Sequence, residues 1–84
     1  MPYFIYILRS QDGTYYVGYT QDLSERLQRH NQGRSKYTKA KRPWELVYSE
    51  ELQDRSSAIQ RELEIKNCKS KVYIETLVRT SRQI

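Results

Sequence analysis

The sequence predicts an α+β domain in which a three-stranded antiparallel β-sheet is flanked by helices, in the order β-β-α-β-α-α. Two β-rich runs at 3–8 and 14–19 flank an Asp-Gly turn signal, and the run 44–50 alternates with period two. Helix signals lie between the second and third strands and again after the third. The 84 residues suffice for one hydrophobic core. We therefore expect a single domain over residues 1–84, with an ordered core of about 3–79.

The first two strands are expected to form a hairpin. The first strand should be central, because its residues are apolar or aromatic at both parities. A three-residue loop with Gly13 in the left-handed conformation pairs Ser10 with Thr14. This register places Tyr6 and Tyr16 on one face of the sheet, whereas a two-residue loop would place them on opposite faces.

A short helix follows the hairpin. Asp22 with Glu25 three residues later forms a capping-box-like start, and a stop signal lies at 31–33. Arg26 and His30 are four residues apart, so they lie one above the other where the helix meets the sheet, and they can reach one site together. Two structural alternatives stay open. Arg26 can pair with Asp22, and a cationic His30 can simply stabilise the helix C-terminus.

The rest of the chain predicts two more helices. The stretch 34–43 is basic and polar, so any helix there is a single turn. Asp54 is expected to cap a helix that runs to about Asn67, and the last helix should begin near Ser70. We expect Cys68 to be a small buried residue. The apolar positions of the last helix are Val72, Tyr73, Ile74, Leu77 and Val78.

Glu62 breaks the pattern of the second helix, because it falls inside the apolar arc instead of on the polar face. It can form an ion pair with Lys66 or toward Arg61, or lie at the rim of the core. It can also be a metal ligand or an acid/base group at the edge of a cleft. The arc is formed by Ala58, Ile59, Leu63 and Ile65.

The charge of the chain favours a polyanionic partner. There are 15 Lys and Arg against 10 Asp and Glu, a net charge of +5. The segment 26–42 contains no acidic residue and nearly half of the positive charge, so it is a candidate for phosphate binding; the alternative is a solvated basic loop. The residues expected to contact nucleic acid are Arg29, Arg34, Lys36, Tyr37, Lys39, Lys41 and Arg42.

The composition excludes several other classes. One cysteine cannot form an internal disulfide, and one cysteine with one histidine cannot complete a tetrahedral zinc site without several carboxylates. No apolar run approaches the roughly 18 residues of a membrane span, and the first residues lack a basic export signal. We therefore expect a cytoplasmic protein without membrane contact.

The candidate residues singled out above could together catalyse phosphodiester hydrolysis. Tyr6, Tyr16 and His30 can accept or relay a proton. Arg26 can neutralise the charge that develops on a phosphorane. Glu62 can hold Mg²⁺, which usually keeps several waters. From composition and periodicity alone, a basic tyrosine-rich α+β domain without this activity fits as well.

The order and spacing of these motifs resemble the GIY-YIG nuclease superfamily, in particular its small stand-alone bacterial members, over most of the chain. Residues 4–8 correspond to the GIY element, with Phe4 in place of the glycine, residues 16–18 to the YIG element, and residues 22–31 to the following helix. Gly18 is expected to allow close approach where a side chain would block the cleft. Further matches are Lys36-Tyr37-Thr38, Arg42-Pro43, Leu46-Val47-Tyr48, Arg61-Glu62 and Ile65-Lys66.

The resemblance implies a compact fold that cleaves one phosphodiester strand with a single divalent metal, Mg²⁺ with Mn²⁺ as its substitute. Tyr6 and Tyr16 are then the motif tyrosines, one of them the general base or the group that orients the attacking water. Arg26 holds the scissile phosphate and Glu62 ligates the metal. His30 assists proton transfer or contacts phosphate.

We therefore expect a metal-dependent endonuclease that acts on DNA in preference to RNA and is structure-selective or weakly specific, with a role in DNA repair or recombination. Specificity is expected to come from a partner protein, because a basic loop reads shape and not sequence. The sequence does not fix the oligomeric state. The alternatives are a nucleic-acid-binding module without catalysis and a protein-interaction adaptor.

Overall fold

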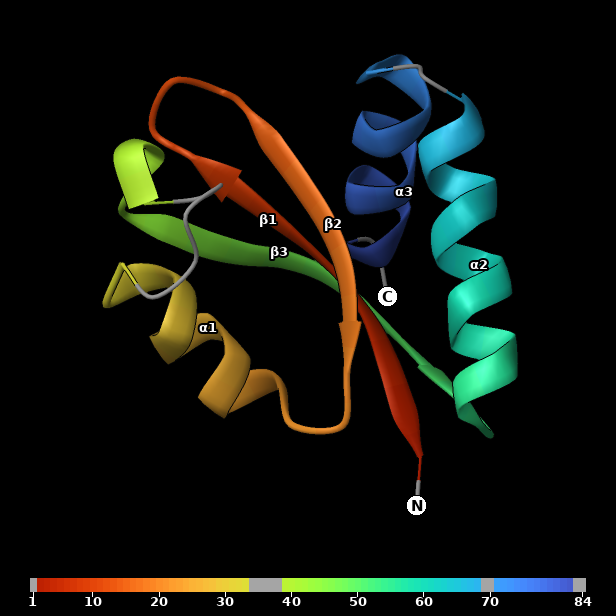
Figure 1. Cartoon of the computed structure of the whole chain (residues 1–84). Coiled ribbons are helices and arrows are strands. Elements are labelled where there is room, and N and C mark those ends of the chain that lie inside the picture. The colour runs from red at the N-terminus through yellow and green to blue at the C-terminus, as the bar shows by residue number, and fades with distance from the viewer. Residues whose placement is uncertain (1, 34–38, 69–70, 83–84) are drawn as a thin grey trace.

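The computed structural model describes residues 2–33, 39–68 and 71–82, and these form the predicted order of elements (Figure 1). A single turn of 3-10 helix within the basic stretch is also confirmed. No helix in these three ranges is both long and apolar enough to cross a bilayer. The elements are β1 (Tyr3–Ser10), β2 (Tyr15–Thr20), α1 (Leu23–Asn31), the 3-10 helix (Lys39–Lys41), β3 (Trp44–Leu52), α2 (Arg55–Cys68) and α3 (Lys71–Arg82).

The sheet is antiparallel with the strand order β2-β1-β3, so β1 is the central strand, as predicted. The predicted hairpin register is also confirmed: the Ser10 amide donates to the Thr14 carbonyl at 2.9 Å, and Gly13 has a φ of 86°. Tyr6 lies opposite Gly18, and Tyr16 shares its face of the sheet. The turn chemistry alone therefore fixes which side chains of the hairpin point the same way.

The helices cover both faces of the sheet. Helix α1 packs on one face, and α2 and α3 pack on the other (Figure 1). The sheet thus separates two core clusters. The cluster toward α2 and α3 contains Ile5, Ile7, Val17 and Ile65. The cluster toward α1 contains Tyr6, Leu8 and Trp44, with Tyr16, Leu23, Leu27 and Leu46 packed against it.

The alternation of β3 predicts one buried face, but the strand packs side chains on both faces of the sheet. Ile7 lies opposite Tyr48 but Leu8 lies opposite Leu46, so Val47 is an extra residue in the ladder. A β-bulge of this kind shifts the side-chain parity of the strand. Leu46 therefore packs toward α1 and Tyr48 packs toward α2 and α3.

Both helix caps are confirmed. The Asp22 carboxylate accepts the Glu25 amide at 3.0 Å, and the Asp54 carboxylate accepts the Ser57 amide at 2.8 Å. These bonds satisfy amides that have no partner within their own helix. Each helix therefore begins where its capping aspartate predicts.

Three burial predictions were wrong. Leu63 is 49% exposed and Val72 is 72% exposed, and Cys68 is exposed and has a free thiol. Ala58 and Ile65 are the buried residues of α2, and Leu63 lies about 140° from Ala58 around the helix at about 100° per residue. The stripe of α2 that faces the sheet therefore excludes Leu63 but includes the half-buried Glu62.

Asn31, the last residue of α1, joins this helix to the first residue of β3. Its Nδ2 donates to the Trp44 carbonyl at 3.1 Å, and its Oδ1 accepts the Trp44 amide at 2.6 Å. One amide side chain thus pairs with both backbone groups of Trp44, as a neighbouring strand would. This bond pair holds α1 against the sheet at the level of Trp44.

We expect Asn31→Ala to lower the free energy of unfolding by about 2 kcal/mol, because two part-buried backbone groups lose their partner. The midpoint of thermal unfolding should fall by roughly 10 °C, measured by circular dichroism. Gln28→Ala, which removes an exposed amide from the same helix, is the matched control. Equal midpoints for the two variants would contradict the role of Asn31.

Candidate active site

The Tyr6 hydroxyl is the point where the sheet and α1 meet. Tyr6 is 2% exposed and His30 is 3% exposed. The Tyr6 hydroxyl and Nε2 of His30 share a hydrogen bond of 3.1 Å, and the Arg26 guanidinium also bonds to this hydroxyl. The structure therefore brings Arg26 and His30 together at Tyr6.

Tyr16 completes this cluster from the neighbouring strand. Its ring centroid lies 6.2 Å from that of Tyr6 and 4.9 Å from that of His30. Trp44 packs against Tyr16 with a centroid distance of 6.3 Å. The sequence did not reveal Trp44 as a neighbour of the site, because its position depends on the pairing of β3 with β1 and on Asn31.

Gly18 makes room for the Tyr6 ring. A Cβ at Gly18 would lie 2.5 Å from the Tyr6 hydroxyl oxygen and 2.7 Å from Cζ. Such contacts are far inside van der Waals separation, and the obstacle is a buried aromatic ring. The absence of a side chain at Gly18 therefore lets the Tyr6 ring lie across β2.

The electrostatic environment keeps both hydrogen-bonded groups neutral. Burial raises the pKa of Tyr6 well above its ordinary value, and the neighbouring Tyr16 raises it further, against a lowering effect of Arg26. Burial lowers the pKa of His30, and the positive charges of Arg26 and Arg29 lower it further. These effects outweigh the preference of a helix C-terminus for a cation, so His30 is neutral at pH 7.

Arg26 has unused hydrogen-bonding capacity. Its Nε is buried and has no hydrogen-bond partner among the described residues. The alternative of an Arg26–Asp22 ion pair is not formed: Asp22 caps the helix. In the same helix, Glu25 pairs with Arg29 at 2.9 Å. The donor that remains on Arg26 fits an oxyanion, which would satisfy a buried N–H.

Glu62 approaches the cluster from α2. After burial and Tyr16, its negative charge is a smaller cause of the raised pKa of Tyr6. Its side chain is 16% exposed, and Oε1 lies 3.3 Å from Nζ of Lys66. The ion pair that the sequence left open as one alternative is thus present.

The described residues contain no group of three or more His, Cys, Asp or Glu side chains that could hold a metal. Some metal ions need no such group, because they accept few protein ligands. Mg²⁺ fits this condition, because it usually keeps several waters and takes one or two carboxylates plus phosphate oxygens. Glu62 supplies a hard carboxylate oxygen, and Arg26 supplies a neighbouring donor for phosphate.

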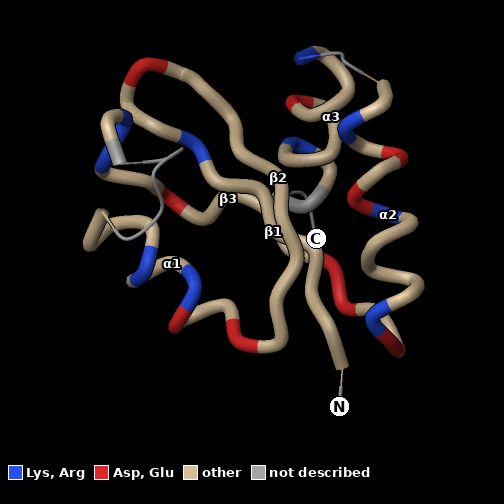
Figure 2. Tube along the Cα trace, in the orientation of Figure 1, with Lys and Arg blue, Asp and Glu red and all other residues tan. Residues whose placement is uncertain are grey.

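The predicted nucleic-acid contacts are only partly described. Figure 2 shows basic residues of α1 and of the 3-10 helix on the α1 side of the sheet. Lys41 bonds to Asp12 at 2.9 Å, and Arg42 is exposed. The Ser10 hydroxyl and the Lys41 ammonium hold the pKa of Asp12 well below its usual range. Arg34, Lys36, Tyr37 and the Lys39 side chain lie outside the described residues.

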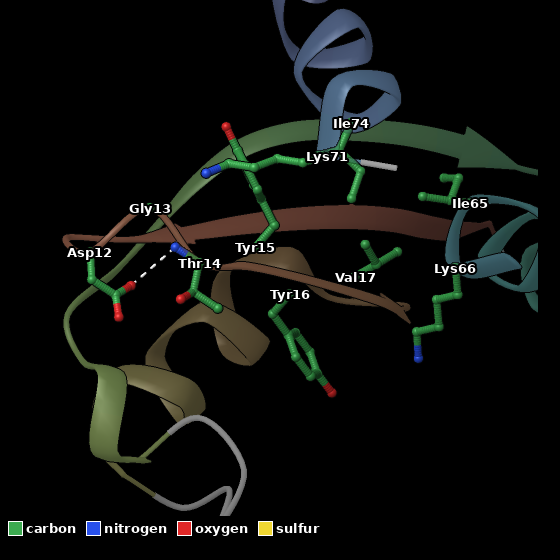
Figure 3. Close-up of a pocket in the computed structure, with 10 residues that line it drawn as sticks. All are labelled: Asp12, Gly13, Thr14, Tyr15, Tyr16, Val17, Ile65, Lys66, Lys71 and Ile74. Atoms are coloured by element: carbon green, nitrogen blue, oxygen red, sulfur yellow. Dashed lines mark hydrogen bonds between the residues drawn. The ribbon is translucent and has the colours of Figure 1, made fainter. Parts of the chain in front are cut away.

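A pocket of about 850 Å³ adjoins Tyr16 along β2 (Figure 3). Sequence reasoning missed it, because its walls come from the β1–β2 turn, β2, α2 and α3. Such contacts between distant segments leave no local pattern. Its lining residues are Asp12, Gly13, Thr14, Tyr15, Tyr16, Val17, Ile65, Lys66, Lys71 and Ile74.

Paired tyrosines on a three-stranded sheet, beside an Arg/His helix and a carboxylate from a second helix, are the arrangement expected from the resemblance to a nuclease-type domain. Residues 2–75 match the family described as the GIY-YIG catalytic domain. The chain belongs to this family.

The chain is also similar to small proteins of the UPF0213 group. UPF0213 proteins of Staphylococcus aureus strains Mu50 and N315 are 46% identical over 65 residues, which is 76% of this chain and 79% of theirs. The solution structure of the UPF0213 protein from Bacillus halodurans is 34% identical and has a TM-score of 0.61. That match covers 95% of this chain and 85% of the other.

We expect Gly18→Ala to lower the free energy of unfolding by about 1–3 kcal/mol, as overpacking does. The direction of this change is informative, because replacing a strand glycine by alanine otherwise raises the free energy of unfolding by about 0.5–1 kcal/mol. Urea unfolding of Gly18→Ala in the wild-type and Tyr6→Leu backgrounds measures the coupling. An equal cost in both backgrounds would show that the Tyr6 ring is not the obstacle.

The lowered pKa of His30 predicts a pH dependence of stability. The folded state disfavours the imidazolium, so the free energy of unfolding should fall as the pH decreases through about 6.5, the ordinary histidine value. The loss should level off below the lowered pKa in the folded state. Urea unfolding between pH 8 and 5 should give a flatter profile for His30→Gln. Parallel profiles would assign the pH dependence to other groups.

Proposed function

We propose that the protein is a divalent-metal-dependent endonuclease that hydrolyses phosphodiester bonds in DNA. The observation that carries this proposal is that the buried Nε of Arg26, beside the Tyr6 hydroxyl, has no hydrogen-bond partner in the part of the chain that the structure describes. A donor fixed in a buried site stabilises negative charge more effectively than a solvated one does. A non-bridging phosphate oxygen is a ligand of the right charge for this position.

The reaction requires a water to attack phosphorus while the bond to the leaving oxygen breaks. Arg26 would stabilise the charge that develops on the non-bridging oxygens. Tyr6 is protonated at neutral pH, because burial raises its pKa, so Tyr6 suits a role in orienting or relaying. Neutral His30 can accept a proton through the bond it shares with Tyr6. Tyr16 lies on the same face and can orient the attacking water or accept its proton.

Glu62 is the residue that would hold Mg²⁺, with Mn²⁺ as the substitute. When bound, the metal would neutralise charge on the phosphate and stabilise the leaving oxygen. Glu62 suits this role because its side chain is only 16% exposed and its charge reaches Tyr6. A carboxylate near the phosphate without a metal would repel it.

The substrate we propose is DNA in preference to RNA, cut with structural selectivity or weak sequence specificity, in repair or recombination within the cytoplasm. The basic residues on the α1 side support backbone contact (Figure 2), and phosphate contacts fix register without reading sequence. A partner protein would then supply target choice.

A second candidate is a nucleic-acid-binding module without catalysis. The ion pair between Glu62 and Lys66 favours it, because a carboxylate that already has a counter-ion needs no metal. This candidate retains the role of Arg26 as a phosphate ligand and removes the role of Glu62 as a metal ligand.

Cleavage of labelled duplex, single-stranded, flap and four-way DNA with Mg²⁺ or Mn²⁺ tests the proposal. We expect Glu62→Gln and Arg26→Ala each to lower the rate by about 100-fold or more. Glu64→Gln is the matched control, since Glu64 is on the same helix with a 65% exposed side chain. DNA binding without cleavage by the wild type would favour the second candidate.

A further inference from the structure

The pocket along β2 has a lysine at each end. Figure 3 shows Lys71 extending from α3 toward the β1–β2 turn, and Lys66 extending from α2 at the opposite end. Nζ of Lys71 lies 3.8 Å from the place of a Cβ at Gly13. Tyr15 and Tyr16 both contribute to the lining between them, and Figure 3 shows their side chains on opposite sides of β2. Positive ends with aromatic walls are features of channels for single nucleic-acid strands.

Lys66 belongs both to this pocket and to the active site. It lines the pocket, and its ammonium lies 3.3 Å from the Glu62 carboxylate. Lys66 is 48% exposed at its side chain, so water screens the pair and the pair is weak. The four-carbon stem of lysine lets the ammonium turn to another anion nearby.

A divalent cation and the Lys66 ammonium would compete for the same carboxylate. Glu62 carries one negative charge, and two cations held on it would repel each other. Metal binding would therefore weaken the hold of Glu62 on the ammonium. Lys66 already lines the pocket. Asp12, the acidic residue in the described lining of the pocket, forms an ion pair with Lys41.

We propose that Lys66 exchanges between two anions. It neutralises Glu62 when no metal is bound, and it binds a phosphate of the nucleic-acid strand next to the scissile bond, within the β2 pocket, once a metal occupies Glu62. This inference rests on the proposed role of Glu62 as a metal ligand. It assigns the β2 pocket to the sugar-phosphate backbone, with Lys71 as the second phosphate contact.

The exchange couples two binding events. Metal binding frees Lys66 for phosphate, and phosphate binding draws Lys66 away from Glu62. By linkage, each ligand must then strengthen the binding of the other by the same factor. The metal site would therefore be strengthened by the presence of the substrate, and a free metal ion would meet a carboxylate that already has a counter-ion.

An acidic protein segment is a less fitting occupant than a nucleic-acid strand. Tyr16 lines the pocket and its ring contacts His30 of the catalytic cluster, so the pocket shares strand β2 with the site at which we place the scissile phosphate. A strand that is cut there continues with further phosphates at a regular spacing. These phosphates can meet the Lys66 and Lys71 ammonium groups in turn.

The first measurement is Mn²⁺ affinity, by calorimetry, for the wild type, Lys66→Met, Lys71→Met and Glu62→Gln. Removal of the competing ammonium should tighten Mn²⁺ binding by about three- to tenfold in Lys66→Met. Lys71→Met removes the same charge from the same pocket and should change the affinity by less than about twofold. Glu62→Gln should lose this binding.

The second measurement is the affinity for a short fluorescent DNA strand with phosphorothioate linkages, by anisotropy, with and without Mn²⁺. Lys66→Met should weaken DNA binding about threefold or more when Mn²⁺ is present and have little effect when it is absent. Lys71→Met should weaken DNA binding under both conditions. This contrast separates exchange from a simple loss of positive charge.

Three results would overturn the inference. Unchanged Mn²⁺ affinity in Lys66→Met, with binding still dependent on Glu62, would show that the ammonium does not compete. An equal loss of DNA affinity with and without Mn²⁺ would show that Lys66 does not exchange. Absence of Glu62-dependent Mn²⁺ binding in both the wild type and Lys66→Met, with and without the DNA strand, would remove the metal role of Glu62, and with it the proposed function.

Discussion

Tyr6 is buried beneath α1, and its hydroxyl can bond to His30 and Arg26 only because the hairpin register places it opposite Gly18. A shift of one residue would turn the ring to the other face of the sheet. A side chain at Gly18 would occupy the space of the ring. The hairpin turn, Gly18 and the position of α1 therefore together determine where the Tyr6 hydroxyl lies.

The same burial that fixes Tyr6 also decides the charge state of its partners. Inside the α1 interface, a Tyr6 phenolate would lose more by dehydration than the Arg26 charge returns, and a His30 imidazolium would lose hydration beside the like charges of Arg26 and Arg29. The pKa shifts of Tyr6 and His30 are therefore in the directions that keep both groups neutral. Arg26 is then the charged group that bonds to the hydroxyl, and an incoming anion meets a positive site beside two neutral groups.

The parts of the fold that the sequence predicted are those with local causes. The Asp-Gly turn specified the register, and the aspartate caps specified where α1 and α2 begin. The bulge at Val47 was missed, because it depends on how β3 meets β1 and leaves the alternation of the sequence unchanged. The exposure of Leu63 was missed because α2 has few apolar residues with which to define a face. In the site, Arg26 and His30 could be placed together from helix spacing, whereas the pocket between β2, α2 and α3 required the tertiary structure.

In the proposed mechanism, the balance of charge at the site links Glu62 with Lys66. Without a ligand, the positive charges of Arg26 and Lys66 exceed the negative charge of Glu62 by one, because Tyr6 and His30 are neutral. One phosphodiester restores neutrality. A divalent cation on Glu62 would leave an excess of positive charge unless further phosphates entered, and Lys66 is the cation placed to receive the next one. In the free protein, Glu62 and Lys66 neutralise each other in an ion pair of 3.3 Å. In the complex, the metal would neutralise Glu62 and a substrate phosphate would neutralise Lys66.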